Sequence, residues 1–174
     1  NDDPLAMFDQ RRHGKKLQAM YGIEPRYLDQ IMSPWAVKRI DEDFGGSLER
    51  ALNEMKVVKV YPSMLKQIAI SKTEPADENN QDTTALVGEV DMRKMEEFGQ
   101  NDTDAYTYSG GLCRGHRGIM EFVEMFKAPI KTLNPLIEAT QDGGFKGSKD
   151  IGIIPFNGII LAHSNESEWA KFRA

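Results

Sequence analysis

Cysteine is almost absent from the sequence, which has a single one, Cys113, in 174 residues. A single cysteine excludes an internal disulfide and any zinc site built from several cysteine ligands. No His and Asn arrangement accompanies Cys113 that would make it a catalytic nucleophile, so we expect an inert thiol. Low cysteine use fits a reducing compartment, and we therefore expect a cytoplasmic protein.

Long apolar runs are also missing, and with them any segment of the about 20 residues that a membrane-spanning helix needs. The acidic start at Asn1 has neither the basic nor the apolar part of a signal peptide. Because the first residue is not methionine, we expect the sequence to begin inside a longer protein. The net charge of -5 gives no general attraction to nucleic acid or anionic lipid, so we expect neither nucleic acid nor membrane as a partner.

Two kinds of nucleotide-handling motif are absent. The sequence has no G-x-x-x-x-G-K-[ST] loop, and it has neither the H-R-D-x-x-x-x-N nor the D-F-G segment of protein kinases. Residues 143–147 are rich in glycine, yet no helix with Lys and Ser follows them, so they favour a hairpin turn. Whatever holds phosphates must therefore belong to a part of the protein outside this sequence.

The composition is typical of one globular domain over residues 1–174, with 40% hydrophobic and 28% charged residues. Residues 1–55 are predicted to form short helices, one of which begins at Ser33-Pro34 and stops at Gly45-Gly46. Ser47 is expected to cap the next helix without a capping box, because the residue three places on is neither an acid nor an amide.

The sheet-forming part, residues 56–174, predicts strands and helices in alternation. The first expected elements are a β-branched strand at 56–61, a helix with Leu65, Ile68 and Ala69 inward, and a surface loop at 73–84. A short helix at 92–98 and a long polar loop at 100–118, which contains Tyr106 and Tyr108, are expected next. The remaining expected elements are a strand at 119–124, a helix at 128–142, a hairpin at 145–155, an apolar strand at 159–162 and a helix at 166–172. The two loop tyrosines are candidates for contact with a partner, although most surface tyrosines make none. The wholly apolar strand is expected in the middle of a mostly parallel sheet, which makes the fold class α/β.

Two polar residues stand where strands of this sheet end. Glu124 ends one strand and Asn165 follows another, and functional groups collect at the carboxyl ends of parallel strands. Alone, Glu124 is more often a solvated glutamate, and Asn165 is more often a turn or cap residue. Together they favour nucleotide hydrolysis, in which a carboxylate polarises the attacking water and an amide contacts the γ-phosphate. His116 and His163 flank the same strands but lack metal-site spacing, and we expect His163 to be packed in its strand.

Longer stretches resemble one protein family. These stretches are Tyr21-Gly-Ile-Glu-Pro-Arg-Tyr-Leu, Ile31-Met-Ser-Pro-Trp-Ala-Val-Lys-Arg, Glu74-Pro-Ala-Asp-Glu-Asn-Asn-Gln-Asp, Glu121-Phe-Val-Glu-Met-Phe-Lys-Ala-Pro and Leu161-Ala-His-Ser-Asn-Glu-Ser-Glu-Trp. The sequence is similar over nearly its whole length to the bacterial PrkA family, which is named for serine protein kinase activity and joins an AAA+ ATP-binding domain to a kinase-related domain. The resemblance implies a partial AAA+ fold of the three-layer P-loop type, downstream of the Walker A loop, with ATP and Mg²⁺ as cofactors of the full-length protein.

The resemblance also implies roles for individual residues. Residues 119–124 correspond to the Walker B strand, in which Glu124 takes the position of the catalytic glutamate. Residues 159–165 correspond to the sensor 1 strand, in which Asn165 takes the position of the polar residue that contacts the nucleotide.

One position departs from the family pattern. Val123 stands where the Walker B aspartate normally helps to hold Mg²⁺, and an apolar side chain cannot bind a cation. Glu121 shares a strand face with Val123, so Glu121 and Glu124 are the expected nucleotide-contacting metal ligands. The alternative for Glu121 is a structural glutamate with a basic partner such as Arg114 or Arg117.

Three interpretations of function stay open. The first is the ATP-binding and hydrolysing domain of a PrkA-like serine protein kinase, and the second is an ATP-driven remodelling or protease-type machine without kinase activity. The third is a non-catalytic fragment for oligomerisation or regulation. The resemblance implies a protein substrate and a homo-oligomer for the full-length protein. The 174-residue piece alone is expected to bind nucleotide poorly and to be inactive, because it lacks the amides that grip phosphates.

Overall fold

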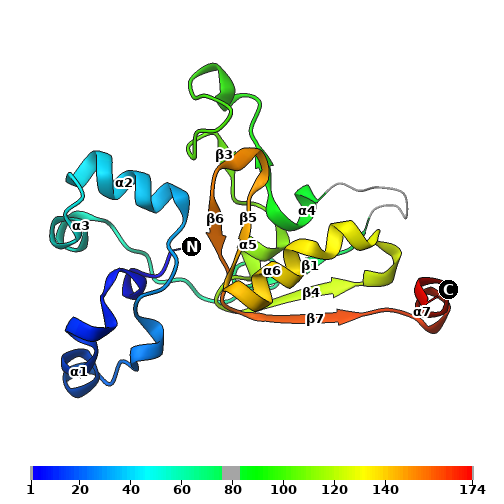
Figure 1. Cartoon of the computed structure of the whole chain (residues 1–174), viewed down its shortest axis with the longest axis horizontal. Coiled ribbons are helices and arrows are strands. Elements are labelled where there is room, and N and C mark those ends of the chain that lie inside the picture. Colours follow the sequence, from blue (N-terminus) through cyan, green and yellow to red (C-terminus); the bar gives the residue numbers. More distant parts are fainter. Residues whose placement is uncertain (1, 76–82, 174) are drawn as a thin grey trace.

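The computed structural model describes residues 2–75 and 83–173, and their arrangement is drawn in Figure 1. The helices, with 3-10 helices written η, are η1 (Pro4–Met7), α1 (Gln10–Tyr21), η2 (Pro25–Tyr27), α2 (Pro34–Phe44), α3 (Leu48–Glu54), α4 (Thr84–Val87), η3 (Lys94–Glu96), α5 (Gly111–Gly115), η4 (Met125–Lys127), η5 (Ile130–Leu133), α6 (Asn134–Asp142), η6 (Ser148–Asp150) and α7 (Glu166–Arg173). The strands are β1 (Ile70–Thr73), β2 (Glu89–Val90), β3 (Tyr106–Thr107), β4 (Ile119–Val123), β5 (Gly144–Lys146), β6 (Ile153–Pro155) and β7 (Ile159–His163).

The helix ends of the N-terminal part form as the sequence predicts. Ser33 caps α2, because its hydroxyl accepts a hydrogen bond from the backbone N–H of Ala36 at 3.2 Å. Gly45 ends the same helix in the left-handed conformation, with φ 62°. Ser47 caps α3 by accepting from the N–H of Arg50 at 3.3 Å, without a capping box. The local stop and start signals in this segment are therefore confirmed.

A parallel sheet of three strands forms the centre of the rest of the chain, in the order β1-β4-β7. Ile70 pairs with Ile119 and Ile119 with Ile159, so the three strands begin level with one another. In Figure 1, β4 and β7 run side by side and point toward α7. The α/β class and the parallel sheet are confirmed.

The sheet is buried on one face. Met120 and Phe122 of β4 point into the core, where Phe145 and Leu112 are fully buried with them. Helix α5 packs against β1 and β4, and α6 packs against β5. Alternation along β4 leaves Glu121 on the other face, which is more exposed.

The predicted place of β7 is wrong. We expected this apolar strand in the middle of the sheet, but among the described strands it lies at the edge, beside β4 alone. Ile159 and Leu161 are 58% and 52% exposed. An apolar run indicates that a strand is suited to burial on both faces, but it does not indicate which other elements cover those faces.

The strand predicted at 56–61 and the helix predicted after it are also wrong. Val57 and Val58 are exposed and have no strand assignment. The next residues form a tight turn that is closed by backbone hydrogen bonds between Ser63 and Ile68, and Leu65 is 98% exposed. β-branched residues favour a strand only where a partner strand is available, and residues 56–61 have none among the described residues.

The long loop predicted at 100–118 contains two elements, β3 and α5, and β3 pairs antiparallel with β2. The hairpin predicted at 145–155 is confirmed by the antiparallel pair β5 and β6. The surface loop predicted at 73–84 lies mostly outside the described residues, since 76–82 are not described. Of the helices that are described, none combines the length and the apolar character needed to cross a bilayer.

Candidate functional site

The carboxyl ends of β4 and β7 bring the two predicted site residues to one edge of the sheet. The last paired residues of these strands are Val123 and His163, which lie opposite each other in parallel register. Glu124 follows Val123 directly, and Asn165 comes two residues after His163. Both residues therefore stand at the same edge of the sheet, the end at which β4 and β7 point toward α7 in Figure 1.

Glu124 has an unusual backbone conformation for a residue other than glycine. Its φ of 51° and ψ of 44° are left-handed, and it begins the short helix η4. Its carboxylate forms an ion pair with the ammonium of Lys127 one turn later. The side chain is 28% exposed, so it is sheltered but reachable by solvent. Residues held in such conformations cost about 1–3 kcal/mol and cluster at functional sites.

Asn165 is the N-cap of helix α7. Its Oδ1 atom accepts from the backbone N–H of Glu168 at 2.9 Å and from the hydroxyl of Ser167 at 2.6 Å. These bonds fix the amide plane and occupy the oxygen, which leaves the Nδ2 group as the donor side of the amide. Asn165 can therefore cap α7 through its side-chain oxygen and still donate a hydrogen bond from Nδ2 at this edge.

Ser164 is a polar residue at this edge that sequence reasoning missed. Its hydroxyl is buried and has no hydrogen-bond partner among the described residues. Buried hydroxyls are usually paired, so this group is available to a water molecule or a ligand. Ser164 follows the last strand residue of β7 and precedes Asn165.

Glu121 has a partner other than those considered from the sequence. Its Oε1 atom lies 3.3 Å from Nε2 of His163 on the exposed face of the sheet. Arg114 instead donates to Gln67, and Arg117 forms an ion pair with Asp3. The two partners named for the alternative of a structural glutamate, Arg114 and Arg117, are therefore wrong, and His163 takes that place. The expected packing of His163 is wrong too, because its side chain is 56% exposed.

The donor set at the strand ends suits Mg²⁺ only in part. Carboxylate oxygens are its preferred protein ligands, and Glu124 places one at the edge. Glu121 belongs to β4 and Glu124 follows the strand, and the carboxylate of Glu121 is next to His163. No cluster of three or more His, Cys, Asp or Glu side chains suited to a metal occurs among the residues described. Magnesium at nucleotide sites usually takes one or two carboxylates, with phosphate and water oxygens as its other ligands.

An aromatic cavity of about 460 Å³ borders this edge, between η4 and α7. Phe126 lies with its ring centroid 5.0 Å from that of Trp169 and 4.7 Å from that of Phe172. Lys127 lines the cavity, whereas Glu124 and Asn165 do not. The cluster holds α7 against η4 and so fixes the position of the cap residue relative to the glutamate.

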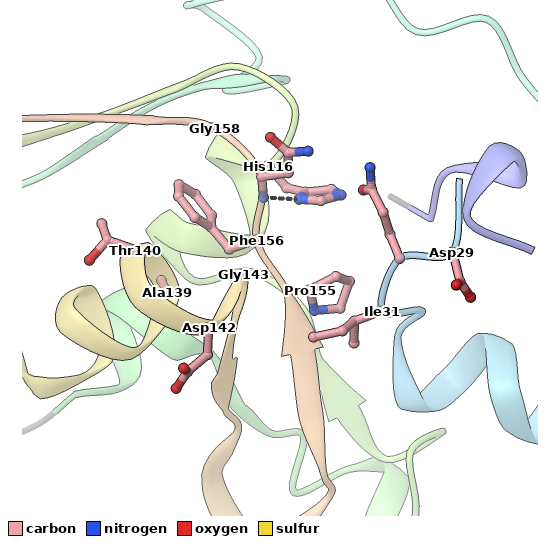
Figure 2. Close-up of a pocket in the computed structure, with 12 residues that line it drawn as sticks. Asp29, Ile31, His116, Ala139, Thr140, Asp142, Gly143, Pro155, Phe156 and Gly158 are labelled. Carbon is pink, nitrogen blue, oxygen red and sulfur yellow. Dashed lines mark hydrogen bonds between the residues drawn. The ribbon is translucent and has the colours of Figure 1, made fainter. Parts of the chain in front are cut away.

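The opposite, amino end of the sheet holds a second group of polar residues around His116. His116 helps to line a hollow of about 460 Å³. In Figure 2 it lies between the 29–31 segment and the end of α6. Nδ1 of His116 accepts from the backbone N–H of Asn157 at 2.9 Å, so a neutral ring carries its proton on Nε2. Burial lowers the pKa of His116 to about 4, helped by the nearby positive charge of Arg117.

The pKa of His116 predicts acid-sensitive stability. In the unfolded chain the ring takes up a proton as the pH falls through about 6.5, whereas in the folded chain it stays neutral until about 4. Folding stability is therefore lost between these values, by about 2 kcal/mol from pH 7 to pH 5. We expect the urea midpoint of the wild-type protein to fall more over this range than that of His116→Asn, which keeps an acceptor for Asn157 and has no proton to gain. Equal shifts in the two proteins would contradict the prediction.

Comparison with known proteins identifies the relatives of this chain. The profile of the PrkA AAA domain matches residues 1–174. The serine/threonine kinase YeaG of Escherichia coli K12 is 61% identical over 173 residues, which are 99% of this chain and 26% of that protein. The ATP-dependent protease PrkA of Bacillus subtilis is 35% identical over 153 residues, which are 87% of this chain and 23% of that protein. The chain thus spans about a quarter of the length of these relatives.

Solved structures with similar chain traces include NtrX of Brucella abortus. One NtrX structure is 13% identical with a TM-score of 0.41, covering 75% of this chain and 26% of that one. The complex of NtrX with ATP is 15% identical with a TM-score of 0.34, covering 80% of this chain and 37% of that one. The match of the family profile over the whole chain and the identity to YeaG confirm the resemblance predicted from the sequence. The chain belongs to the PrkA AAA domain family.

Proposed function

We propose that this chain supplies two side chains of an ATP-hydrolysing site, with Glu124 activating the attacking water and Asn165 contacting the γ-phosphate. The observation that carries this proposal is the shared carboxyl edge of β4 and β7, where the parallel register ends at Val123 and His163. Ligands of open α/β sheets bind beyond this end of the strands. The phosphate-binding loop then comes from the part of the full-length protein outside these 174 residues.

Glu124 and Asn165 have different roles because one is a carboxylate and the other an amide. A carboxylate accepts a proton from water and raises its nucleophilicity, and Glu124 is partly exposed at the edge. An amide N–H donates to the negative oxygens of a phosphate, and Asn165 keeps its Nδ2 group for this because its oxygen is held by α7. The unpaired hydroxyl of Ser164 offers a further donor beside Asn165.

We assign the Mg²⁺ contact of this chain to Glu124, directly or through a bound water. When bound, Mg²⁺ supplies positive charge to the phosphate oxygens as the transferring bond breaks. Glu121 is the weaker candidate, because its carboxylate pairs with His163. The ammonium of Lys127 pairs with the carboxylate of Glu124 and holds it at the sheet edge.

The acceptor of the phosphoryl group separates two versions of this function. YeaG is named a serine/threonine kinase, whereas Bacillus subtilis PrkA is named an ATP-dependent protease. Both names imply use of ATP, and they differ in whether a serine hydroxyl or water takes the phosphate. We further propose that the full-length protein acts on a protein substrate and self-associates. Measuring free phosphate against phosphoserine from labelled ATP, with the full-length protein and a protein mixture, separates the two versions.

Replacing Asn165 by aspartate separates its two roles. Aspartate keeps a side-chain oxygen for the N–H of Glu168 and is as good an N-cap as asparagine, so stability is expected to stay the same. It also replaces the Nδ2 donor by a negative oxygen facing phosphate, so ATP hydrolysis is expected to fall about 10²-fold. Phosphate release and thermal unfolding of the full-length protein check both expectations.

The alanine variant completes this experiment. Asn165→Ala removes the cap as well as the donor and is expected to cost roughly 1 kcal/mol of stability in addition to activity. If Asn165→Asp hydrolyses ATP at the wild-type rate, then Asn165 is a helix cap only.

A further inference from the structure

A cavity at the amino end of the sheet has no part in the proposed ATP site. It has a volume of about 390 Å³, and the residues that line it include Trp35 of α2, Tyr106 of β3, Ile154 of β6 and the loop residue Tyr108. We call it the tyrosine cavity. His116, which precedes β4, also lines it, whereas Glu124 follows the other end of β4. The five residues of that strand, at about 3.3 Å each, separate the two places by about 16 Å.

Two hydroxyl groups in the lining of this cavity are left without partners. Oγ1 of Thr103 and the phenolic oxygen of Tyr108 are both buried, and neither has a partner in good hydrogen-bond geometry within the described structure. The backbone N–H of Trp35 lies near the Tyr108 oxygen as a donor, which leaves the O–H of Tyr108 without an acceptor among the described residues. A buried polar group without a partner is unfavourable and uncommon in folded proteins. Two of them in one cavity indicate that a molecule carrying hydrogen-bonding atoms completes it.

The walls of the cavity are aromatic and apolar. The rings of Tyr106 and Tyr108 pack edge to face with centroids 5.1 Å apart, which fixes the position of the Tyr108 hydroxyl. The hydroxyl of Tyr106 is already used, because it donates to the carbonyl of Val87 at 2.7 Å. Trp35 and Ile154 add apolar surface. Such walls suit a flat ring, and the volume is within the usual range for small-molecule sites.

The charges around the cavity are already satisfied inside the protein. The carboxylate of Asp2 accepts from the N–H and the hydroxyl of Ser33 at 2.7 and 2.8 Å. Asp104 forms an ion pair with Lys38 at 2.7 Å. Lys94 lies at the exposed rim and donates to the backbone oxygen of Asp104 at 3.1 Å. The interior of the cavity therefore favours a ligand without charge.

Covalent chemistry is not expected in this cavity. Cys113 is the reactive residue type in its lining, and burial raises the pKa of its thiol to about 11. At neutral pH the thiol keeps its proton, and it is a poor nucleophile in that form. This agrees with the inert thiol predicted from the sequence and leaves reversible binding.

We propose that the tyrosine cavity binds an uncharged, planar heteroaromatic ligand whose polar edge pairs with the hydroxyls of Thr103 and Tyr108. The ring lies against Trp35 and Tyr106, and the ligand takes the two hydrogen bonds that the protein leaves unmade. This site is independent of the proposed ATP site, because neither Glu124 nor Asn165 lines the tyrosine cavity.

The neutral lactam 2-quinolone is a suitable probe, since it is flat and offers one carbonyl and one N–H. Its affinity for the full-length protein is measured by calorimetry with ATP present at saturation, so that the nucleotide site is occupied. We expect binding that weakens about tenfold in Thr103→Val and about tenfold in Tyr108→Phe. Both variants are expected to fold normally, because among the described residues neither hydroxyl has a partner in good hydrogen-bond geometry, and the N–H of Trp35 is the one donor near the Tyr108 oxygen.

Two controls make the result decisive. Ser109→Ala removes an exposed hydroxyl from the same loop and is expected to bind the probe like the wild-type protein. Quinoline-2-carboxylate, which has a similar ring and a negative charge, is expected to bind more weakly than 2-quinolone. The proposal is overturned if 2-quinolone does not bind, if the two hydroxyl variants bind it as the wild-type protein does, or if the carboxylate binds equally well.

Discussion

Replacing Glu124 by glutamine in the full-length protein is expected to lower ATP hydrolysis by a factor of about 10²–10⁴, which is the usual contribution of a positioned general base. Glutamine keeps the size of the side chain and the ability to accept a hydrogen bond from Lys127, but it cannot take a proton from water. ATP affinity in the presence of Mg²⁺ is expected to fall as well, because we assign the Mg²⁺ contact of this chain to Glu124, whereas ATP affinity without Mg²⁺ is expected to change little. Phosphate release and ATP affinity, measured on the same protein, check both parts.

Glu121→Gln is the matched control for this experiment. Glu121 lies on β4, three residues before Glu124, and its carboxylate pairs with His163 on the exposed face. We expect the Glu121→Gln variant to retain most ATP hydrolysis. If it instead weakens Mg²⁺-dependent ATP binding, Glu121 is the second metal carboxylate, in place of the missing aspartate at Val123. Wild-type hydrolysis by Glu124→Gln would contradict the proposed role of Glu124.

The same variant reports on the kinase version of the function. If a serine hydroxyl takes the phosphate at this site, phosphoserine formation is expected to fall in parallel with phosphate release. If phosphoserine formation persists while hydrolysis is lost, the kinase chemistry belongs to another part of the full-length protein. In both cases the rate of phosphate release tests the proposed role of Glu124, and phosphoserine formation tests which part of the protein carries the kinase chemistry.

Local signals explain which parts of the fold the sequence could predict. Ser33 and Gly45 define the ends of α2 through contacts within the helix itself, so no distant residue is needed to place them. The run at 56–61 has strand propensity of the same local kind, but a strand forms only with a partner. Its valines are exposed, and β1 begins at Ile70. Whether residues 56–61 form a strand depends on pairing with another strand, and the local sequence does not encode that pairing.

The candidate site also has features that could be predicted from the sequence and features that could not. The meeting of Glu124 and Asn165 at one edge could be predicted, because parallel strands that begin level also end together. The ion pair with Lys127 and the use of the Asn165 oxygen by α7 depend on backbone angles and on the packing of Trp169. Those contacts could not be predicted from residue types.

The tyrosine cavity shows the limit of sequence reasoning more sharply. Tyr106 and Tyr108 stand in a polar stretch and were expected on the surface, but Tyr106 is buried and the hydroxyl of Tyr108 is inside the protein. The cause is the pairing of β3 with β2, which draws this loop onto the core. A two-residue strand is too short to give a periodic signal, so nothing local marked the change.

Replacing Gly118 by alanine is expected to destabilise the domain by about 3 kcal/mol or more, the upper part of the range for overpacking. A Cβ atom at this position would lie 1.8 Å from the carbonyl oxygen of Ala69. That oxygen accepts from the N–H of Ile119 at 2.8 Å, and the oxygen of Gly118 accepts from Ile159 at 2.8 Å. The clash therefore falls where β1, β4 and β7 begin together, and the backbone cannot move away without breaking the register that aligns their far ends.

Gly99→Ala is the control for this prediction, since a Cβ atom at Gly99 meets nothing within 4 Å. Urea and thermal unfolding of the full-length variants measure the difference, with hydrogen exchange of β4 as the local readout. Because the register at Ile119 also sets where Glu124 and Asn165 stand, Gly118→Ala is expected to lower ATP hydrolysis in the fraction that still folds. Stability of Gly118→Ala equal to that of Gly99→Ala would show that the start of the sheet is not held in the way these contacts indicate.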